Sequence, residues 1–309
     1  MIDVSTLDES SHSAIDTACR EWGFFQVVGH GVGAAHLAGM QAAATHFFQQ
    51  PTQAKRALSR TADNPWGFFD QELTKNRRDW KEILDIGADN GGEFDPFPAA
   101  RVQWPAAPSN FEQVMRHHFM QCEQLSYKLL GALARNLGVA AQSLNATFGT
   151  DHASFLRLNH YPVCENPAPP DADFAPQAGE LGISHHTDAG ALTVLWQDQV
   201  ASLQVNHKGA WHAVAPQPNA LVINIGDVVQ VWSNDGYRAP LHRVLANADS
   251  QRLSAAFFFN PSYAASYAPL EGSGAAKYRS ISWREFRAGR AGGDYADSGK
   301  ELQIADYRI

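Results

Sequence analysis

The sequence predicts a mainly β protein with flanking helices and a sandwich or jelly roll at its centre, the cupin-like architecture. Three observations lead to this fold class. Short segments with alternating apolar and polar residues recur over residues 150–265, separated by turn residues. Stretches with the helical period of apolar residues precede and follow that series. No linker rich enough to separate independent domains interrupts the chain, so we expect one unit over residues 1–309.

The N-terminal half is expected to be mixed up to residue 110 and helical over residues 111–148. Predicted helices cover residues 14–23, 33–50, 51–60 and 111–137, with Pro51 at one helix start and Gly138 after the last helix. An apolar strand is predicted at 24–32. Residues 62–110 are rich in Pro and Gly and indicate loops around short strands such as 80–87.

The C-terminal half contains the expected jelly-roll core, residues 150–265, followed by a helix and tail over residues 266–309. Its predicted strands cover residues 154–162, 191–198, 203–214, 220–233, 242–247 and 252–261. One more surface helix is expected at residues 281–290.

Composition narrows the possible partners. The 24 basic and 32 acidic residues give a formal charge of −8, and no Lys/Arg cluster stands out, so we expect neither nucleic acid nor a membrane as partner. Three widely spaced cysteines form no zinc or disulfide pattern, which suits a reducing compartment. No apolar run approaches the roughly 18 residues of a membrane helix, and residues 1–13 lack the features of a signal peptide. We therefore expect a cytoplasmic protein.

The segment SHHTDAG, residues 184–190, contains a candidate metal site. On a strand, His186 and Asp188 point to one face and His185 to the other. His242 stands at the head of a later strand and offers a third ligand. Two histidines and one carboxylate with open positions form the site of non-haem Fe(II) oxygenases. By itself an H-x-D pair is more often an ordinary surface or hydrogen-bonded pair.

Arg252 and Ser254 are also spaced by two and share a strand face with Phe258. An arginine that points into a barrel is costly unless a carboxylate or phosphate meets it. The pair therefore suits binding of an acid group, although an arginine on an edge strand in solvent gives the same pattern.

Together these residues resemble the Fe(II)/2-oxoglutarate-dependent dioxygenase superfamily, and within it the isopenicillin N synthase-like branch. The likeness covers nearly the whole chain. It is carried by the ordered segments 21–32, 79–87, 157–162, 186–198, 232–244, 252–261 and 294–308.

The resemblance implies that the jelly-roll core is a double-stranded β-helix, and it implies roles for individual residues. It assigns His186, Asp188 and His242 as iron ligands. It places Asn159 and Tyr161 beside the co-substrate. It implies that Arg252 and Ser254 bind the distal carboxylate of 2-oxoglutarate. It also implies that Phe258 contacts the primary substrate. His185 and His160 are expected to face away from the site.

The implied function is a non-haem Fe(II) oxygenase that uses O2 and 2-oxoglutarate to hydroxylate or desaturate a small molecule, with release of succinate and CO2. Two alternatives remain open. One is an isopenicillin N synthase-like oxidase that uses no 2-oxoglutarate; the other is a non-catalytic metal-binding barrel.

The substrate is expected to be small and largely apolar or aromatic. Phe258 should line the far wall of the cavity. Further aromatic side chains in the N-terminal half are Phe24, Phe25, Trp66, Phe68 and Phe69, most of them expected in the core. Loops at residues 62–110 and 165–182 should select the substrate, and the Pro-rich segment 164–180 is either a lid or a solvated loop.

Overall fold

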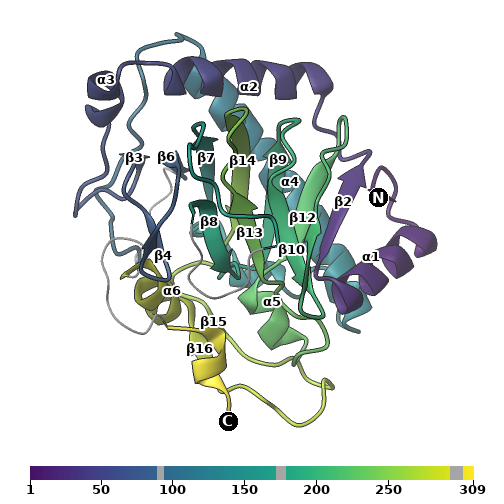
Figure 1. Ribbon diagram of the computed structural model, residues 1–309. Helices are drawn as coiled ribbons and strands as arrows, with labels where there is room; N and C mark the ends of the chain where they lie inside the picture. The colour runs from purple at the N-terminus through teal and green to yellow at the C-terminus, as the bar shows by residue number, and fades with distance from the viewer. Residues whose placement is uncertain (89–93, 172–178, 293–301) are drawn as a thin grey trace.

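The computed structural model of the chain describes residues 1–88, 94–171, 179–292 and 302–309 (Figure 1). Two sheets of unequal size face each other. The larger sheet has, in order across it, β1 (Ile2–Asp3), β2 (Phe24–Val28), β12 (Leu221–Ile225), β9 (Leu192–Gln197), β14 (Arg252–Phe259), β7 (Phe155–Tyr161), β6 (Glu82–Gly87) and β3 (Gly67–Phe69). Its neighbours pair antiparallel except β1 and β2.

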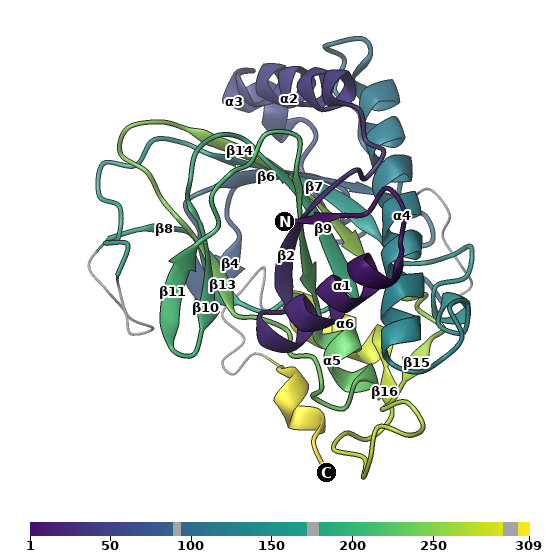
Figure 2. The same cartoon turned by 90° about the vertical axis from the view of Figure 1, so that its right-hand side faces the viewer.

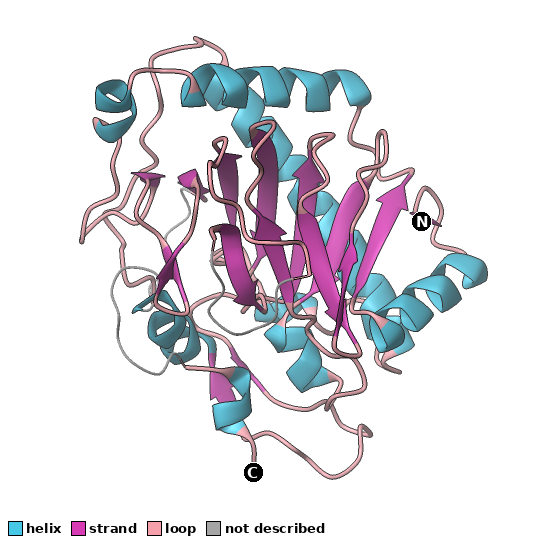
Figure 3. Ribbon diagram, viewed as in Figure 1, coloured by secondary structure: helices cyan, strands magenta, loops and turns pink. Residues whose placement is uncertain are grey.

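The smaller sheet supplies the opposite wall. Its order is β11 (Ala210–Ala213), β10 (Leu203–His207), β13 (His242–Leu245) and β8 (Leu181–His186). Two further strand pairs lie outside the sheets: β4 (Leu73–Thr74) with β5 (Arg77–Arg78), and β15 (Ser266–Tyr267) with β16 (Ile281–Ser282). Two facing sheets, antiparallel apart from the β1–β2 pair, confirm the predicted jelly-roll class (Figure 3).

The helices of the described residues are α1 (Glu9–Glu21), α2 (Ala34–Phe48), α3 (Thr52–Arg56), α4 (Phe111–Asn136), α5 (Asp227–Trp232) and α6 (Trp283–Gly292), with short 3-10 turns at Asn145–Thr147 and Ile304–Tyr307. Helices α1, α2 and α4 lie on the outer side of the larger sheet, whereas α5 and α6 lie below it (Figure 2). The long helix α4 runs behind the sheet, and α6 lies at its lower end in Figure 1. Among the described residues, no helix combines the length and apolar character needed to cross a bilayer.

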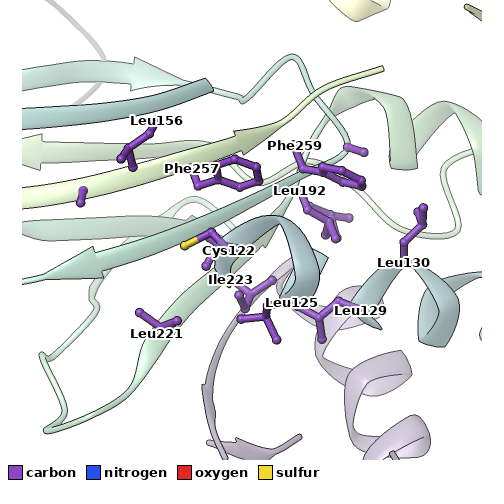
Figure 4. Packing of buried hydrophobic residues seen from close by; sticks show 14 of the residues in the cluster. Cys122, Leu125, Leu129, Leu130, Leu156, Leu192, Leu221, Ile223, Phe257 and Phe259 are labelled. Atoms are coloured by element: carbon purple, nitrogen blue, oxygen red, sulfur yellow. The ribbon is translucent and has the colours of Figure 1, made fainter. Parts of the chain in front are cut away.

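Alternation along β14 and β7 separates the hydrophobic core from the cavity between the sheets. Leu156, Phe257 and Phe259 point toward α4 and meet Cys122 and Leu125 there (Figure 4). These side chains are almost completely buried. Because successive strand residues alternate faces, the intervening residues of both strands face the smaller sheet. One pair of strands thus supplies both the core and a wall of the site.

Two predicted strands differ from the structure. Residues 203–214 form the hairpin of β10 and β11 instead of one strand, and residues 220–233 are the second case. Residues 220–233 were expected to be strand throughout, but the strand ends at Ile225 and α5 begins at Asp227. Gly226 separates the two elements, and an acidic residue in the first turn suits a helix N-terminus. Apolar residues are buried all along α5, and such a short buried run has no period that tells helix from strand.

Candidate active site

The two candidate histidines lie side by side on neighbouring strands of the smaller sheet. His186 is the last residue of β8 and His242 is the first of β13, and the two form a registered antiparallel pair. Their ring centres are 4.3 Å apart. Residues directly opposite each other in antiparallel strands have neighbouring side chains. Strand pairing therefore brings together two residues that are far apart in the sequence.

Asp188 lies beyond the end of β8, so the prediction that one strand face carries both His186 and Asp188 was wrong in this detail. A tight turn positions it instead. The amide of Asp227 donates to the Asp188 carbonyl at 2.8 Å, and the amide of Val228 donates to the Gly190 carbonyl at 3.1 Å. A Cβ on Gly226 would lie 2.2 Å from the Gly190 oxygen. The close approach of α5 to this turn thus requires glycine.

The three side chains converge, with one potential ligand atom of each within 4.8 Å of the others. Nε2 of His186 and Nε2 of His242 are each 3.6 Å from Asp188 Oδ1. Nδ1 of His186 lies 2.9 Å from the Ser184 carbonyl, and Nδ1 of His242 lies 3.1 Å from the Pro240 carbonyl. A carbonyl only accepts, so each Nδ1 carries the proton and each Nε2 presents a lone pair. This donor set fits Fe(II).

The aspartate is fixed by neighbours that the sequence analysis did not identify. Thr193 Oγ1 and Asn224 Nδ2 donate to Asp188 Oδ2 at 2.5 and 2.7 Å, which leaves Oδ1 directed at the histidines. Thr193 is on β9 and Asn224 is opposite it on β12. No local motif marks them, because pairing of two distant strands brings them to Asp188.

The ionisation states also suit a cation. Burial, followed by the nearby His242, lowers the pKa of His186 well below its usual range. Burial alone raises the pKa of Asp188, but His242, His186 and the two hydrogen bonds outweigh burial and lower it overall. Neutral imidazoles and an ionised carboxylate are the forms that bind a metal.

Arg252 is buried beside this group without a carboxylate partner among the described residues. Its guanidinium donates to Gln197 Oε1 at 3.0 Å and to Ser254 Oγ at 3.3 Å, and its side chain is 1% exposed. It also lies 5.0 Å from the ring centre of Tyr161. Asn159 Nδ2 is 3.5 Å from Ser254 Oγ, and Asn159 Oδ1 has no hydrogen-bond partner in the part of the chain that the structure describes. A buried cation of this kind fits the carboxylate of a small acid.

The register of β7 and β14 extends this wall. Arg252 pairs with Tyr161 and Ser254 with Asn159, followed by Ala256 with Arg157 and Phe258 with Phe155. All four pairs line one cavity of about 160 Å³ that also contains the His–Asp–His group. Phe258 therefore lies in the cavity wall as predicted, stacked on Phe155 at 4.8 Å. Arg157 and Phe155 were missed, although their spacing from Asn159 places them on the same face.

A network of buried charges forms another part of the wall. Glu72 accepts from Lys81 at 2.6 Å and from Arg157 at 2.8 Å. Lys81 also lies 3.2 Å from Asp79, and Arg157 lies 2.7 Å from Asp85. Burial raises the pKa of Asp79 to about 6. The region 62–110 thus reaches the cavity through charged residues, which its loop-like composition did not indicate.

Other sequence expectations have mixed outcomes. His185 and His160 are absent from the cavity lining, as expected, and His160 Nδ1 is 2.7 Å from Glu82. Phe24 lines the cavity, whereas Phe25 and Phe68 are buried in the core. The middle of the lid-or-loop segment, residues 172–178, lies outside the described residues, as do residues 89–93 and 293–301.

Comparisons with known proteins agree with this geometry. Residues 152–261 match the model of the 2OG-Fe(II) oxygenase superfamily. Residues 1–107 match the model described as non-haem dioxygenase in morphine synthesis N-terminal.

Two relatives and one solved structure illustrate the similarity. Jasmonate-induced oxygenase 1 of Arabidopsis thaliana is 34% identical over 84% of this chain, which spans 63% of that protein. Flavanone 3-dioxygenase 2 of Oryza sativa subsp. japonica is 33% identical, over 93% of this chain and 81% of that protein. The crystal structure of JOX2 in complex with 2OG, Fe and JA has a TM-score of 0.84 and 29% identity, over 100% of this chain and 88% of that chain.

Fold, site and comparisons together define a non-haem iron oxygenase. The chain belongs to the 2OG-Fe(II) oxygenase superfamily. It is therefore an oxidoreductase whose cofactors are Fe(II) and the co-substrate 2-oxoglutarate, and the reading as an oxidase without 2-oxoglutarate loses its support.

Proposed function

We propose that this chain oxidises a small organic molecule, with His186, Asp188 and His242 as the iron ligands. The observation that carries the proposal is the convergence of two Nε2 lone pairs and Asp188 Oδ1 at one point of the cavity. Fe(II) held there would supply the activation of O2. One oxygen atom would enter succinate as 2-oxoglutarate loses CO2, and the other would enter the product in a hydroxylation or leave as water in a desaturation.

The protein itself contributes position and charge. Arg252, assisted by Ser254, is proposed to hold the distal carboxylate of 2-oxoglutarate through paired N–H donors. Asn159 and Tyr161 are proposed to flank the same molecule from β7, their strand partners being Ser254 and Arg252. Walls of buried side chains exclude water from the reacting groups.

Phe258 is proposed to contact the primary substrate. Its ring stacks on Phe155 within the cavity wall, six positions along β14 from Arg252. The cavity of about 160 Å³ suits a small molecule, in line with the JA bound to JOX2. The composition points the same way, because a net charge of −8 offers no basic surface to bind a nucleic acid.

We also propose one catalytic unit over residues 1–309, working in the cytoplasm. Support for the location is that Cys19, Cys122 and Cys164 are buried free thiols.

Succinate release in the presence of Fe(II), 2-oxoglutarate and O2 tests the proposed function. A panel of small apolar and aromatic molecules should stimulate release above the substrate-free rate. A histone-tail peptide and an alkylated oligonucleotide should not. Strong stimulation by either polymer, or no 2-oxoglutarate consumption with any addition, would overturn it.

A further inference from the structure

The cavity contains a cation that the reaction described so far does not use. Arg287, on α6, lines the cavity and is half-buried. Its guanidinium carbon lies 5.9 Å from the ring centre of Phe155. Phe155 in turn stacks on Phe258, so a cation borders the aromatic pair at the end of the β7–β14 ladder.

Each of the other cationic side chains in the cavity either interacts with groups of the protein or has a proposed role in binding 2-oxoglutarate. Lys81 and Arg157 each pair with buried carboxylates. Arg290 donates to the Thr187 carbonyl at 2.8 Å and to Gln303 Oε1 at 3.0 Å, and it interacts electrostatically with buried Asp227. Arg252 is the proposed partner of the distal carboxylate of 2-oxoglutarate.

Arg287 differs from all of these. Within the described parts of the chain, it has neither a hydrogen bond nor a salt bridge to any side chain. A guanidinium that lies near a ring face keeps its N–H edge available for a carboxylate. A single cation next to the apolar surface of Phe155 and Phe258 is complementary to a ligand that is apolar except for one negative charge.

We propose that the primary substrate is a small monocarboxylic acid with an apolar or aromatic body. Arg287 binds its carboxylate, and the Phe155–Phe258 pair packs against its body. The proposal rests on the proposed function, since it takes Arg252 to be occupied by 2-oxoglutarate. It goes further by giving the substrate a charge and by assigning a residue of α6 to its recognition.

The test compares acids with neutral analogues of equal size. The probes are phenylacetic, 1-naphthylacetic and decanoic acids and their primary amides. Each is titrated by calorimetry, under nitrogen, into the full chain loaded with Fe(II) and 2-oxoglutarate, so that no turnover occurs. Arg287→Gln is compared with Arg284→Gln, which removes an exposed arginine from the same helix.

We expect at least one acid to bind saturably and its amide to bind about 10- to 100-fold more weakly, the range of a charge-assisted pair. Arg287→Gln should abolish this difference and Arg284→Gln should preserve it. Equal binding of acid and amide, an unchanged preference in Arg287→Gln, or no binding of any acid would overturn the proposal. Failure of the proposed function looks different, because the unmodified protein would then not bind 2-oxoglutarate in the presence of Fe(II).

Discussion

The two ends of the cavity are held in different ways. Around Asp188, each proposed ligand has a partner that fixes its orientation, and the surrounding side chains are mostly buried. Around Phe155, the wall includes a stacked aromatic pair, the charge-balanced Arg157 and the half-buried Arg287. Side chains fixed by hydrogen bonds suit a reaction that needs a defined geometry. An apolar wall with the single charge of Arg287 can accept ligands of different shapes. The comparison suggests that reaction and substrate choice can be altered separately.

The largest effect is expected at the iron end. His186→Ala and His242→Ala should each abolish succinate formation, because removal of one of three ligands destroys the metal site. His185→Ala should retain most activity, since His185 does not line the cavity. Steady-state succinate release measures all three variants. A fully active His186→Ala protein would contradict the claim that the end of the cavity around Asp188 carries the reaction.

Arg252→Ala should produce the next largest effect. Removing one partner of a buried charged pair costs about 2–5 kcal/mol, so the KM for 2-oxoglutarate should rise by at least about 30-fold. Fe(II) affinity should change little, because Arg252 is not a proposed ligand. Initial rates across 2-oxoglutarate concentrations measure the first quantity, and anaerobic Fe(II) titration measures the second. An unchanged KM contradicts the assignment.

Asn224→Ala should have an intermediate effect. It removes the 2.7 Å hydrogen bond to Asp188 Oδ2 and leaves the three proposed ligands in place. Loss of such an outer contact typically lowers metal affinity by about 10- to 100-fold. Thr193→Val removes the other hydrogen bond and should act in the same direction. If both variants bind Fe(II) like the unmodified protein, the support around Asp188 is less important than its geometry indicates.

The smallest effect on the reaction itself is expected from Phe258→Ala. Its ring is in the cavity wall, so the variant should change which small molecules stimulate turnover more than the substrate-free rate. Phe257→Ala is the matched control, since Phe257 is completely buried on the other face of β14. That substitution should cost about 3–5 kcal/mol of unfolding free energy. Substrate profiles and thermal unfolding of both proteins separate the two roles.

How far the sequence predicted the structure also differs between the two ends. Strand alternation placed Arg252, Ser254 and Phe258 on one face, and the structure has all three in the cavity wall. The same reasoning wrongly put Asp188 on the strand of His186, because the turn that positions it depends on contact with α5. Chain folding brings Arg287 to the aromatic pair from a distant helix. Local sequence patterns do not predict such contacts between segments that are far apart in the chain.

The central claim is that one end of the cavity binds Fe(II) and 2-oxoglutarate together. Anaerobic titration of Fe(II) into the protein, with and without 2-oxoglutarate, tests it most directly through the weak visible charge-transfer band of the chelate. We expect the band only when both are present. It should be lost in His186→Ala and should require much more 2-oxoglutarate in Arg252→Ala. No band in the unmodified protein with both components at saturation, or a band unchanged in His186→Ala, would contradict the claim.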